Sequence, residues 1–448
     1  MTARTNSEEG RGERSASVAG GVPISHLPSA ISQVSRRLLP FLFLLYTVNF
    51  LDRVNVSFAA LQMNRDLGFS ASVYGFGAGV FFIGYVLFGV PANALLLRIG
   101  VRRWLGGMMV VWGVISALTA LIHRPGEFYL LRALLGFAEA GFFPGLIFYL
   151  AQWFPMADRA RAIARCMIAV PVAGVIGGPL SGWILGFDGW HGVAGWRWLF
   201  VLEALPAVVL GALTWKTLPE RPADARWLSP EERAELEAAI AADAPSEQPQ
   251  HRPATSALPA TLWVMAAIWL GVALVGYGWN LWLPQVLAQR SSQSVLAIGW
   301  LSAIPQLAGV AGALWFSAQS DRLRERRLPV ALTAGMVVMG LLVLANTSSL
   351  PLSIAAFALM AAGQCGLWGP FWTLPSEYLS GAALATGVAI INSVGNIGGF
   401  LGPYLMGVLR DRSTGFGSGF LVLAGIQSLA VLLAFGLWKG HRPLAVSR

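Results

Sequence analysis

Long apolar stretches separated by short polar segments account for most of the chain. Twelve of them, each roughly 20 residues long, follow one another from Leu38 to Trp438. A helix of that length crosses the ~30 Å hydrocarbon layer of a bilayer. The predicted spans are 38–60, 73–97, 104–122, 128–151, 162–186, 197–215, 260–288, 297–318, 329–346, 352–375, 384–408 and 419–438. The pattern predicts an all-α, polytopic membrane protein with twelve transmembrane helices.

Polar segments divide the chain into parts. Residues 1–37 are predicted to form a disordered cytoplasmic leader, because the first apolar run begins too late for a cleavable signal peptide. The longest internal polar segment, 216–259, separates six spans from six. We therefore expect one six-helix bundle over 38–215, a second over 260–438, and a cytoplasmic tail over 439–448.

The segment between the two halves contains a helix-start signal. Ser229 is followed three residues later by Glu232, which is the spacing of a capping box, and an amphipathic run comes after it. We predict a short cytoplasmic helix that joins the two bundles. A plain linker is favoured over a regulatory segment.

Sequence features recur between the two halves at a nearly constant offset. Three arginines after the second span recur 224 positions later, and Gly178-Pro179 recurs as Gly402-Pro403 at the same offset. The segment AEAGFFPG of the fourth span aligns with GQCGLWGP of the tenth at an offset of 225. These matches indicate two six-helix halves in parallel repeat. The repeated arginines are Arg98, Arg102, Arg103, Arg322, Arg326 and Arg327.

Composition excludes several classes of protein. Hydrophobic residues fill 56% of the 448 positions and charged residues only 12%, about half of the ~25% typical of soluble domains. With a mean hydropathy of +0.62, the chain cannot cover a water-exposed surface. A soluble enzyme, a nucleic-acid-binding protein and a disulfide-stapled secreted module are ruled out. Cys166 and Cys365 fall in opposite halves, and we expect small buried side chains, not a disulfide or metal site.

Membrane orientation accounts for most of the net charge of +9. Of the 31 Lys and Arg residues, 23 fall on the side of the two termini and six on the opposite side, while Arg53 and Arg132 lie inside spans. Basic residues concentrate on the cytoplasmic side of membrane proteins. We therefore predict a multi-pass protein of the inner (plasma) membrane with both termini in the cytoplasm, and the charge requires no nucleic-acid partner.

Five ionisable residues lie deep in apolar spans: Asp52, Arg53, Arg132, Glu139 and Glu203. Each such charge costs about 2.5 to 3.5 kcal/mol on insertion scales, so these groups must pair or face a wet cavity. Arg132 and Glu139 are seven residues apart and share one helix face. Asp52 and Arg53 point about 100° apart, so one can face the fourth span and the other the cavity. We favour an ion and substrate path over a neutral network that only joins helices. Glu203 is expected to be a structural or gating partner.

The second half carries no matching charges. At the offset of 225, Glu139 corresponds to Gln364, Asp52 to Tyr277 and Arg53 to Gly278. All five histidines lie outside the spans, so any transported proton should be carried by a carboxylate. We expect the first half to handle protons and anions and the second to supply neutral recognition. The candidate recognition residues are Tyr85, Tyr277, Asn280, Gln364, Trp368, Trp372, Asn392 and Asn396. For each tryptophan, packing or an interfacial position is the favoured alternative.

Distinctive motifs follow one another along the chain: LDRVNV, AEAGFFPG, LPERPADARWL and INSVGNIGG. In these motifs the chain resembles the major facilitator superfamily, and within it the anion:cation symporter family of organic-anion transporters. The likeness extends from about Phe41 to Trp438. The chain departs from the family at Asn93, which occupies the usual acidic position of the arginine motif after the second span, and at Gly89 and Ala92, where the family often has Glu and Ser.

The resemblance implies a transporter, not an enzyme, that imports a small organic anion together with protons by alternating access of the two bundles. Arg53 would bind the substrate carboxylate, and Asp52 and Glu139 would be proton sites. Arg132 would couple them, because protonation of Glu139 would release it. The repeated arginines would act in gating. Family substrates include tartrate-like dicarboxylates, sugar acids and aromatic acids such as phthalate.

The sequence also indicates which partners to expect, and it leaves two alternative functions open. We expect no cofactor and no metal, and the partners are the organic anion, protons and the lipid bilayer around a monomer. A proton-driven efflux antiporter for amphipathic drugs, suggested by Gly178-Pro179, is one alternative. A non-transporting membrane sensor is another, although the chain lacks a sizeable soluble output domain.

The predicted orientation is tested with a cysteine at Ser246, in the segment between the two halves. In intact cells, Ser246→Cys should resist a membrane-impermeant thiol reagent, because this segment carries the basic residues assigned to the cytoplasm. A cysteine at Arg124, in a segment assigned to the opposite side, is the control and should react. Labelling of the first variant from outside would show that the orientation in the membrane is the reverse of the predicted one.

Overall fold

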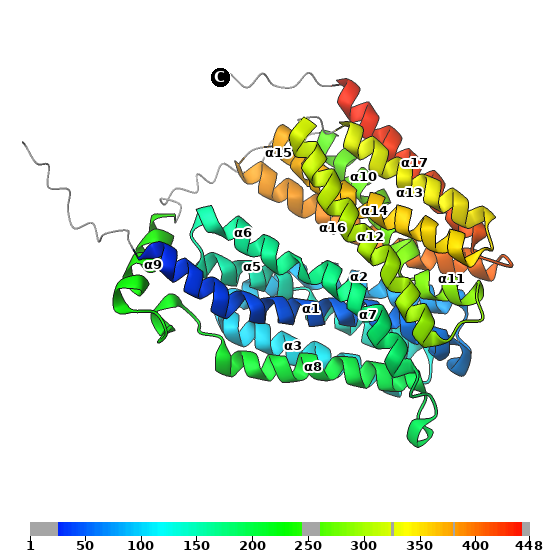
Figure 1. The fold of residues 1–448 in the computed structure, drawn as a ribbon, viewed down its shortest axis with the longest axis horizontal. Coiled ribbons are helices and arrows are strands. Elements are labelled where there is room, and N and C mark those ends of the chain that lie inside the picture. Colours follow the sequence, from blue (N-terminus) through cyan, green and yellow to red (C-terminus); the bar gives the residue numbers. More distant parts are fainter. Residues whose placement is uncertain (1–25, 244–259, 324–326, 380, 441–448) are drawn as a thin grey trace, which may run out of the picture.

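A computed structural model describes residues 26–243, 260–323, 327–379 and 381–440, and all regular structure in these ranges is helical. Twelve helical segments within the described residues are long and apolar enough to cross a membrane. The sequence-based prediction of twelve spans in an all-α fold is therefore confirmed. The helices form two six-helix bundles, which lie side by side in Figure 1.

The first bundle contains α1 to α8 and the second α10 to α17. The helices of the first are α1 (Leu27–Leu67), α2 (Ala71–Ile99), α3 (Val101–Leu118), α4 (Pro125–Glu139), α5 (Phe142–Trp153), α6 (Met156–Met167), α7 (Ala169–Leu185) and α8 (Gly195–Thr217). Helix α9 (Pro230–Ala242) follows in the linker. Those of the second are α10 (Ala260–Asn280), α11 (Leu283–Gln289), α12 (Val295–Leu323), α13 (Arg327–Asn346), α14 (Leu350–Thr373), α15 (Pro375–Tyr378), α16 (Gly381–Asp411) and α17 (Gly417–Gly440).

Helix α1 begins at Leu27, eleven residues before the predicted start of the first span, so residues 27–37 of the predicted disordered leader are helical. The extension is helical because α9 packs beside it. Glu232 of α9 accepts hydrogen bonds from Ser29 Oγ (2.8 Å) and Gln33 Nε2 (2.7 Å), and the His26 backbone N–H donates to Glu235 Oε2 (3.0 Å). Residues 1–25 of the predicted leader and 441–448 of the tail lie outside the described residues, as does 244–259 of the linker.

The start of α9 is the predicted capping box. Ser229 Oγ accepts from the Glu232 N–H (3.1 Å), and Glu232 Oε2 accepts from the Ser229 N–H (3.1 Å).

The fifth span also differs from the prediction at its start. Helix α6 already begins at Met156 instead of at 162, directly after Pro155, and it leads into α7. Arg159 and Arg161, which precede the predicted span, are therefore helical.

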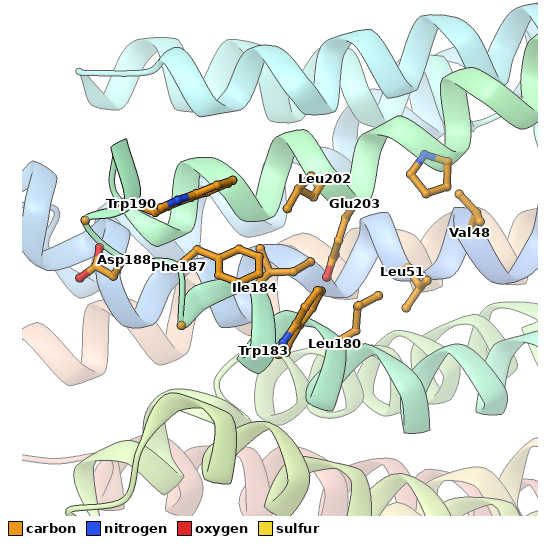
Figure 2. A pocket seen from close by; sticks show the side chains of 13 residues that line it. Val48, Leu51, Leu180, Trp183, Ile184, Phe187, Asp188, Trp190, Leu202 and Glu203 are labelled. Carbon is orange, nitrogen blue, oxygen red and sulfur yellow. The ribbon is translucent and has the colours of Figure 1, made fainter. Parts of the chain in front are cut away.

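The two bundles are joined by α2 packed on α16 and by α7 packed on α12. Backbones approach closely at glycines: a Cβ atom on Gly79 would lie 2.6 Å from the Phe400 carbonyl oxygen, and one on Gly178 2.5 Å from that of Gly299. In the first bundle, α1, α7 and α8 border a groove (Figure 2). The bundles converge toward one end and diverge toward the end that carries α9 and α15 (Figure 1).

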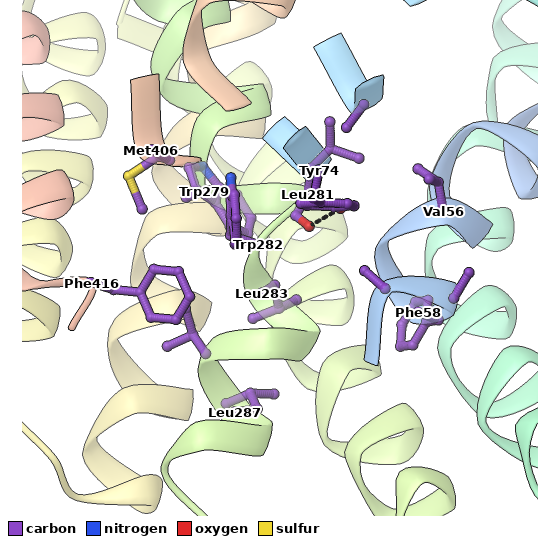
Figure 3. Close-up of a cluster of buried hydrophobic side chains, with 14 of the residues drawn as sticks. Val56, Phe58, Tyr74, Trp279, Leu281, Trp282, Leu283, Leu287, Met406 and Phe416 are labelled. Carbon is purple, nitrogen blue, oxygen red and sulfur yellow. Dashed lines mark hydrogen bonds between the residues drawn. The ribbon is translucent and has the colours of Figure 1, made fainter. Parts of the chain in front are cut away.

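At the converging end, a cluster of buried side chains from both bundles fills the contact. This closed-end cluster includes Phe58 of α1, Tyr74 of α2, Trp282 after α10 and Met406 of α16 (Figure 3). The Tyr74 hydroxyl donates to the Leu281 carbonyl oxygen of the other bundle at 2.7 Å. The bundles therefore meet there through an apolar contact that also contains a buried hydrogen bond.

One carboxylate completes the closed end. Asp411, the last residue of α16, accepts from the backbone N–H groups of Ala71 (2.9 Å) and Ser72 (2.8 Å) at the start of α2. These N–H groups have no partner within their own helix, and the positive end of the helix dipole favours an anion. A residue of the second bundle thus caps a helix of the first.

We predict that Gly75→Ala opens this end, because the added Cβ would clash with the Pro403 carbonyl of α16. Spin labels at cysteines replacing Arg65 and Arg412, in a background with Cys166 and Cys365 replaced by alanine, should report a longer distance by double electron–electron resonance.

The matched control is Gly89→Ala in the same helix, where no atom lies within 4 Å of the added Cβ. It should leave the distance distribution unchanged. Equal distributions for the two variants would show that the close backbone contact at Gly75 does not hold the end closed.

Candidate functional site

Arg53 of α1 lies at the centre of the site. Its Nε donates to Glu139 Oε2 at 2.8 Å. The Glu139 side chain is completely buried, whereas 17% of the Arg53 side chain remains accessible. Glu139 is the last residue of α4, and the helix is interrupted at residues 140–141 before α5 begins. The site is thus built where the fourth span breaks.

Aromatic rings surround the guanidinium. Its Cζ lies 5.2 Å from the ring centroid of Phe50, 5.5 Å from that of Phe81 and 5.0 Å from that of Tyr85. Such faces attract a cation without using its N–H groups. Of the three guanidinium nitrogens of Arg53, only Nε makes a hydrogen bond to a described residue. The two terminal nitrogens are therefore free to bind the two oxygens of a carboxylate.

Glu139 has a second donor that the sequence analysis missed. Asn49 Nδ2 donates to Glu139 Oε2 at 2.9 Å, while Glu139 Oε1 is buried without a hydrogen-bond partner among the described residues. Asn49 precedes Arg53 by four residues, and this helical spacing places both on one face of α1. That spacing is the signal by which it could have been found.

Arg132 does not pair with Glu139, contrary to the prediction. It is buried, its Cζ lies 5.1 Å from the Phe81 ring centroid, and its Nε and Nη1 have no hydrogen-bond partner among the described residues. Seven residues of helix separate the two α-carbons by about 10.5 Å along the axis. Arg53 reaches Glu139 from the neighbouring helix instead, so Arg132 acts on Glu139 only through its field.

Asp52 and Arg53 point in different directions, as adjacent helical residues must, but Asp52 faces neither a cavity nor α4. It is fully buried against α3, and its Oδ1 accepts from Ser116 Oγ (2.8 Å) and Asn55 Nδ2 (3.2 Å). Ser116 was not singled out in the sequence, because a lone serine in an apolar span carries no pattern. Arg53 alone both contacts α4 and remains partly accessible.

Only part of the predicted recognition set lies near Arg53. Tyr85 faces the guanidinium from α2. Tyr277 of α10 comes from the other bundle, with its ring centroid 4.3 Å from that of Phe82, and lies within electrostatic range of Arg53. These two tyrosines therefore place the site at the boundary between the bundles.

The other candidates lie elsewhere in the second bundle. Gln364 is buried and its Nε2 donates to the Val272 carbonyl at 3.1 Å. Trp372 packs edge-on against Trp269, as its packing alternative requires. The remaining three polar candidates and one tryptophan are exposed or half-buried, and in the described part of the chain none of them bonds to Arg53; they are Asn280, Trp368, Asn392 and Asn396. Asn396 Nδ2 donates to the Asn392 carbonyl at 3.0 Å.

The repeated arginines are described in the first half only. Arg102 Nε lies 3.5 Å from Glu220 Oε2, a residue of the linker, and Arg98 and Arg103 are exposed. Of the second set, Arg326 lies outside the described residues, and the side chains of Arg322 and Arg327 are not described. Within the described residues, no group of three His, Cys, Asp or Glu side chains could hold a metal ion.

The model of the Major Facilitator Superfamily matches residues 42–403 and 268–447. The chain belongs to the major facilitator superfamily. This confirms the family that the motifs indicated, and with it a transporter rather than an enzyme.

Relatives within this superfamily carry different names. A putative metabolite transport protein, NicT, of Pseudomonas putida is 41% identical over 92% of this chain and 96% of its own length. A putative tartrate transporter of Agrobacterium vitis is 39% identical, covering 93% and 92% of the two chains. A quinolone resistance transporter of Acinetobacter baumannii is also 39% identical, covering 91% and 93%.

Solved structures share the fold. A bacterial homolog of the human lysosomal transporter Spinster, in an inward-facing and unoccupied conformation, superposes with a TM-score of 0.74 at 20% identity and covers 94% of this chain and 98% of its own.

Proposed function

We propose that this transporter imports a small organic anion in symport with protons, by alternating access of the two bundles. The observation that carries the proposal is the guanidinium of Arg53, held at Nε by buried Glu139 while its terminal nitrogens have no partner among the described residues. A charged group inside an apolar span that still has donors without a partner is suited to bind a ligand of opposite charge.

Substrate binding rests on the shape of the guanidinium. A carboxylate accepts two parallel hydrogen bonds from the free edge of Arg53, and a bidentate, charge-assisted pair is strong in a low-dielectric site. Tyr85 and Tyr277 would flank the anion from the two bundles. The C-terminal half would contribute neutral contacts, for which Asn280, Gln364, Trp368, Trp372, Asn392 and Asn396 are candidates.

Coupling follows from charge balance among Asp52, Arg53, Arg132 and Glu139. Two acids and two arginines are neutral together when all are ionised. Protonation of Glu139 leaves Arg53 without its counter-charge, and a carboxylate then restores neutrality at the same place. One proton and one negative charge are therefore each bound more favourably in the presence of the other, as symport requires. Asp52 is the second candidate proton site, and Arg132 would influence both acids through space.

The remaining parts of the proposal concern orientation and gating. We place the protein in the inner membrane with both termini and the linker in the cytoplasm, as the distribution of basic residues favours. Arg102 and Glu220, with Arg98 and Arg103, would form a gate at that side, and Arg322, Arg326 and Arg327 the corresponding set of the second half. We propose a monomer, because each chain would contain its own complete site.

Relatives named for tartrate transport favour an organic anion. The relative named for quinolone resistance favours a second candidate, a proton-driven efflux antiporter. The two functions differ in their need for Arg53. Loss of anion uptake together with retained drug resistance in Arg53→Gln would support the antiporter.

We predict that Arg53→Lys weakens anion binding by at least about tenfold while expression stays near normal, because lysine keeps the charge but loses the planar fork. Binding is measured as the thermal shift of purified protein against a panel of tartrate, sugar acids, phthalate and hydroxyphenylacetates. Arg65→Lys, at an exposed position of the same helix, is the control. Unchanged affinity in Arg53→Lys would show that the anion binds elsewhere.

We further predict that Glu139→Gln, which imitates the protonated acid, abolishes accumulation driven by a pH gradient but preserves substrate counterflow in liposomes. Counterflow needs no net proton movement, so it separates coupling from binding. The control is Glu127→Gln at the exposed start of the same helix, which should behave as the wild type.

Each other outcome assigns a different role to Glu139. Accumulation with a normal pH dependence would move the coupling proton to another group, with Asp52 the first to test. Loss of counterflow as well would make Glu139 a structural or substrate-binding residue.

A further inference from the structure

The groove bordered by α1, α7 and α8 in the first bundle does not include Arg53 or Glu139 among its lining residues. It has a volume of about 970 Å³ and runs between α1, α7 and α8 near the loop that joins the last two (Figure 2). Apolar side chains form most of its walls, among them Leu51, Leu180 and Leu202. Trp183 and Trp190 are more than half exposed along it. All the residues that line the groove belong to the first bundle.

A buried acid lies at the base of the groove. Glu203 is in the middle of α8 and only 4% exposed, and it lines the groove. Its Oε1 accepts from Ser181 Oγ of α7 at 2.8 Å, whereas its Oε2 is buried beside Asn55 of α1 and accepts no hydrogen bond of regular geometry among the described residues. An unpaired carboxylate oxygen in an apolar span is costly, and a ligand that donates a hydrogen bond would relieve that cost.

The acidic and aromatic residues of the groove indicate which kind of ligand it would bind. Among the described residues that line the groove, the charged ones are Glu203 and Asp188, and both are acidic. Asp188 already accepts from the Gly195 N–H at 2.9 Å, which leaves Glu203 as the acid with a buried oxygen that accepts no regular hydrogen bond among the described residues. Trp183 and Phe187 have ring centroids 4.9 Å apart and present an aromatic wall beside it. Aromatic faces and a carboxylate together favour a cation with an apolar body.

We propose that this groove binds an amphipathic ammonium ion. The ammonium group donates to Glu203 Oε2, and the apolar body packs on Trp183 and Phe187. Neither Arg53 nor Glu139 lines the groove, so this is a second site with the opposite charge preference to the one proposed for the anion.

The test compares two water-soluble ligands of one shape, 4-phenylbutylammonium and 4-phenylbutanol, by calorimetric titration of the full-length protein in lipid nanodiscs. The wild type should bind the ammonium at least about tenfold more tightly than the alcohol, as a charge-assisted bond at a desolvated carboxylate requires. This comparison needs no variant. Equal affinities, or a preference for the alcohol, would overturn the proposal, because Glu203 would then be a neutral acid or the site a lipid groove.

Two variants locate the site. Glu203→Gln keeps the shape and the Ser181 contact but removes the charge, so it should lower the ammonium affinity to that of the alcohol. Trp183→Ala removes a wall and should weaken both ligands. Glu127→Gln, an exposed acid of α4, should change neither. Unchanged ammonium binding in both groove variants would place the ligand elsewhere on the protein and contradict the assignment.

Discussion

The ion pair between Arg53 and Glu139 is the interaction on which the rest of the site depends. Both groups lie in apolar helices, where an uncompensated charge costs several kcal/mol, and their contact at 2.8 Å neutralises them. The pair joins α1 to the end of α4, at the point where the fourth span is interrupted. It is incomplete as a hydrogen-bonded unit, since it engages only one nitrogen of the guanidinium. A pair that stabilises the fold and still has free donors can hold helices together and bind a ligand.

The asymmetry between the halves follows from the same constraint. The two bundles repeat one architecture, yet the positions that correspond to Asp52, Arg53 and Glu139 hold Tyr277, Gly278 and Gln364. Gln364 makes a neutral hydrogen bond to the backbone of its own bundle. Placing all four charges in one bundle keeps their mutual compensation independent of how the bundles are arranged. The second bundle can then move relative to the first without separating any buried ion pair of this set.

The sequence predicted the architecture better than the contacts of the site. Local patterns of apolar residues and helix caps can be recognised in a single sequence. They indicated the twelve spans, the repeat and the capping box at Ser229. The partner of Glu139 is different, because it depends on which neighbouring helix reaches it. Spacing alone favoured Arg132 on the same helix, but the guanidinium that contacts Glu139 is that of Arg53 on α1, whereas that of Arg132 lies over the Phe81 ring. The start of α1 was missed for the same reason: its extension is fixed by carboxylates of α9, 200 residues further along the chain.

The attachment of α9 to α1 also limits what the linker must do mechanically. Because Glu232 and Glu235 hold α9 on the extension of α1, the linker helix travels with the first bundle as one body. A change in the relative position of the two bundles would therefore leave the hydrogen bonds between α9 and the start of α1 intact. The polar face of the first bundle that carries α9 would keep its shape in every arrangement of the two halves.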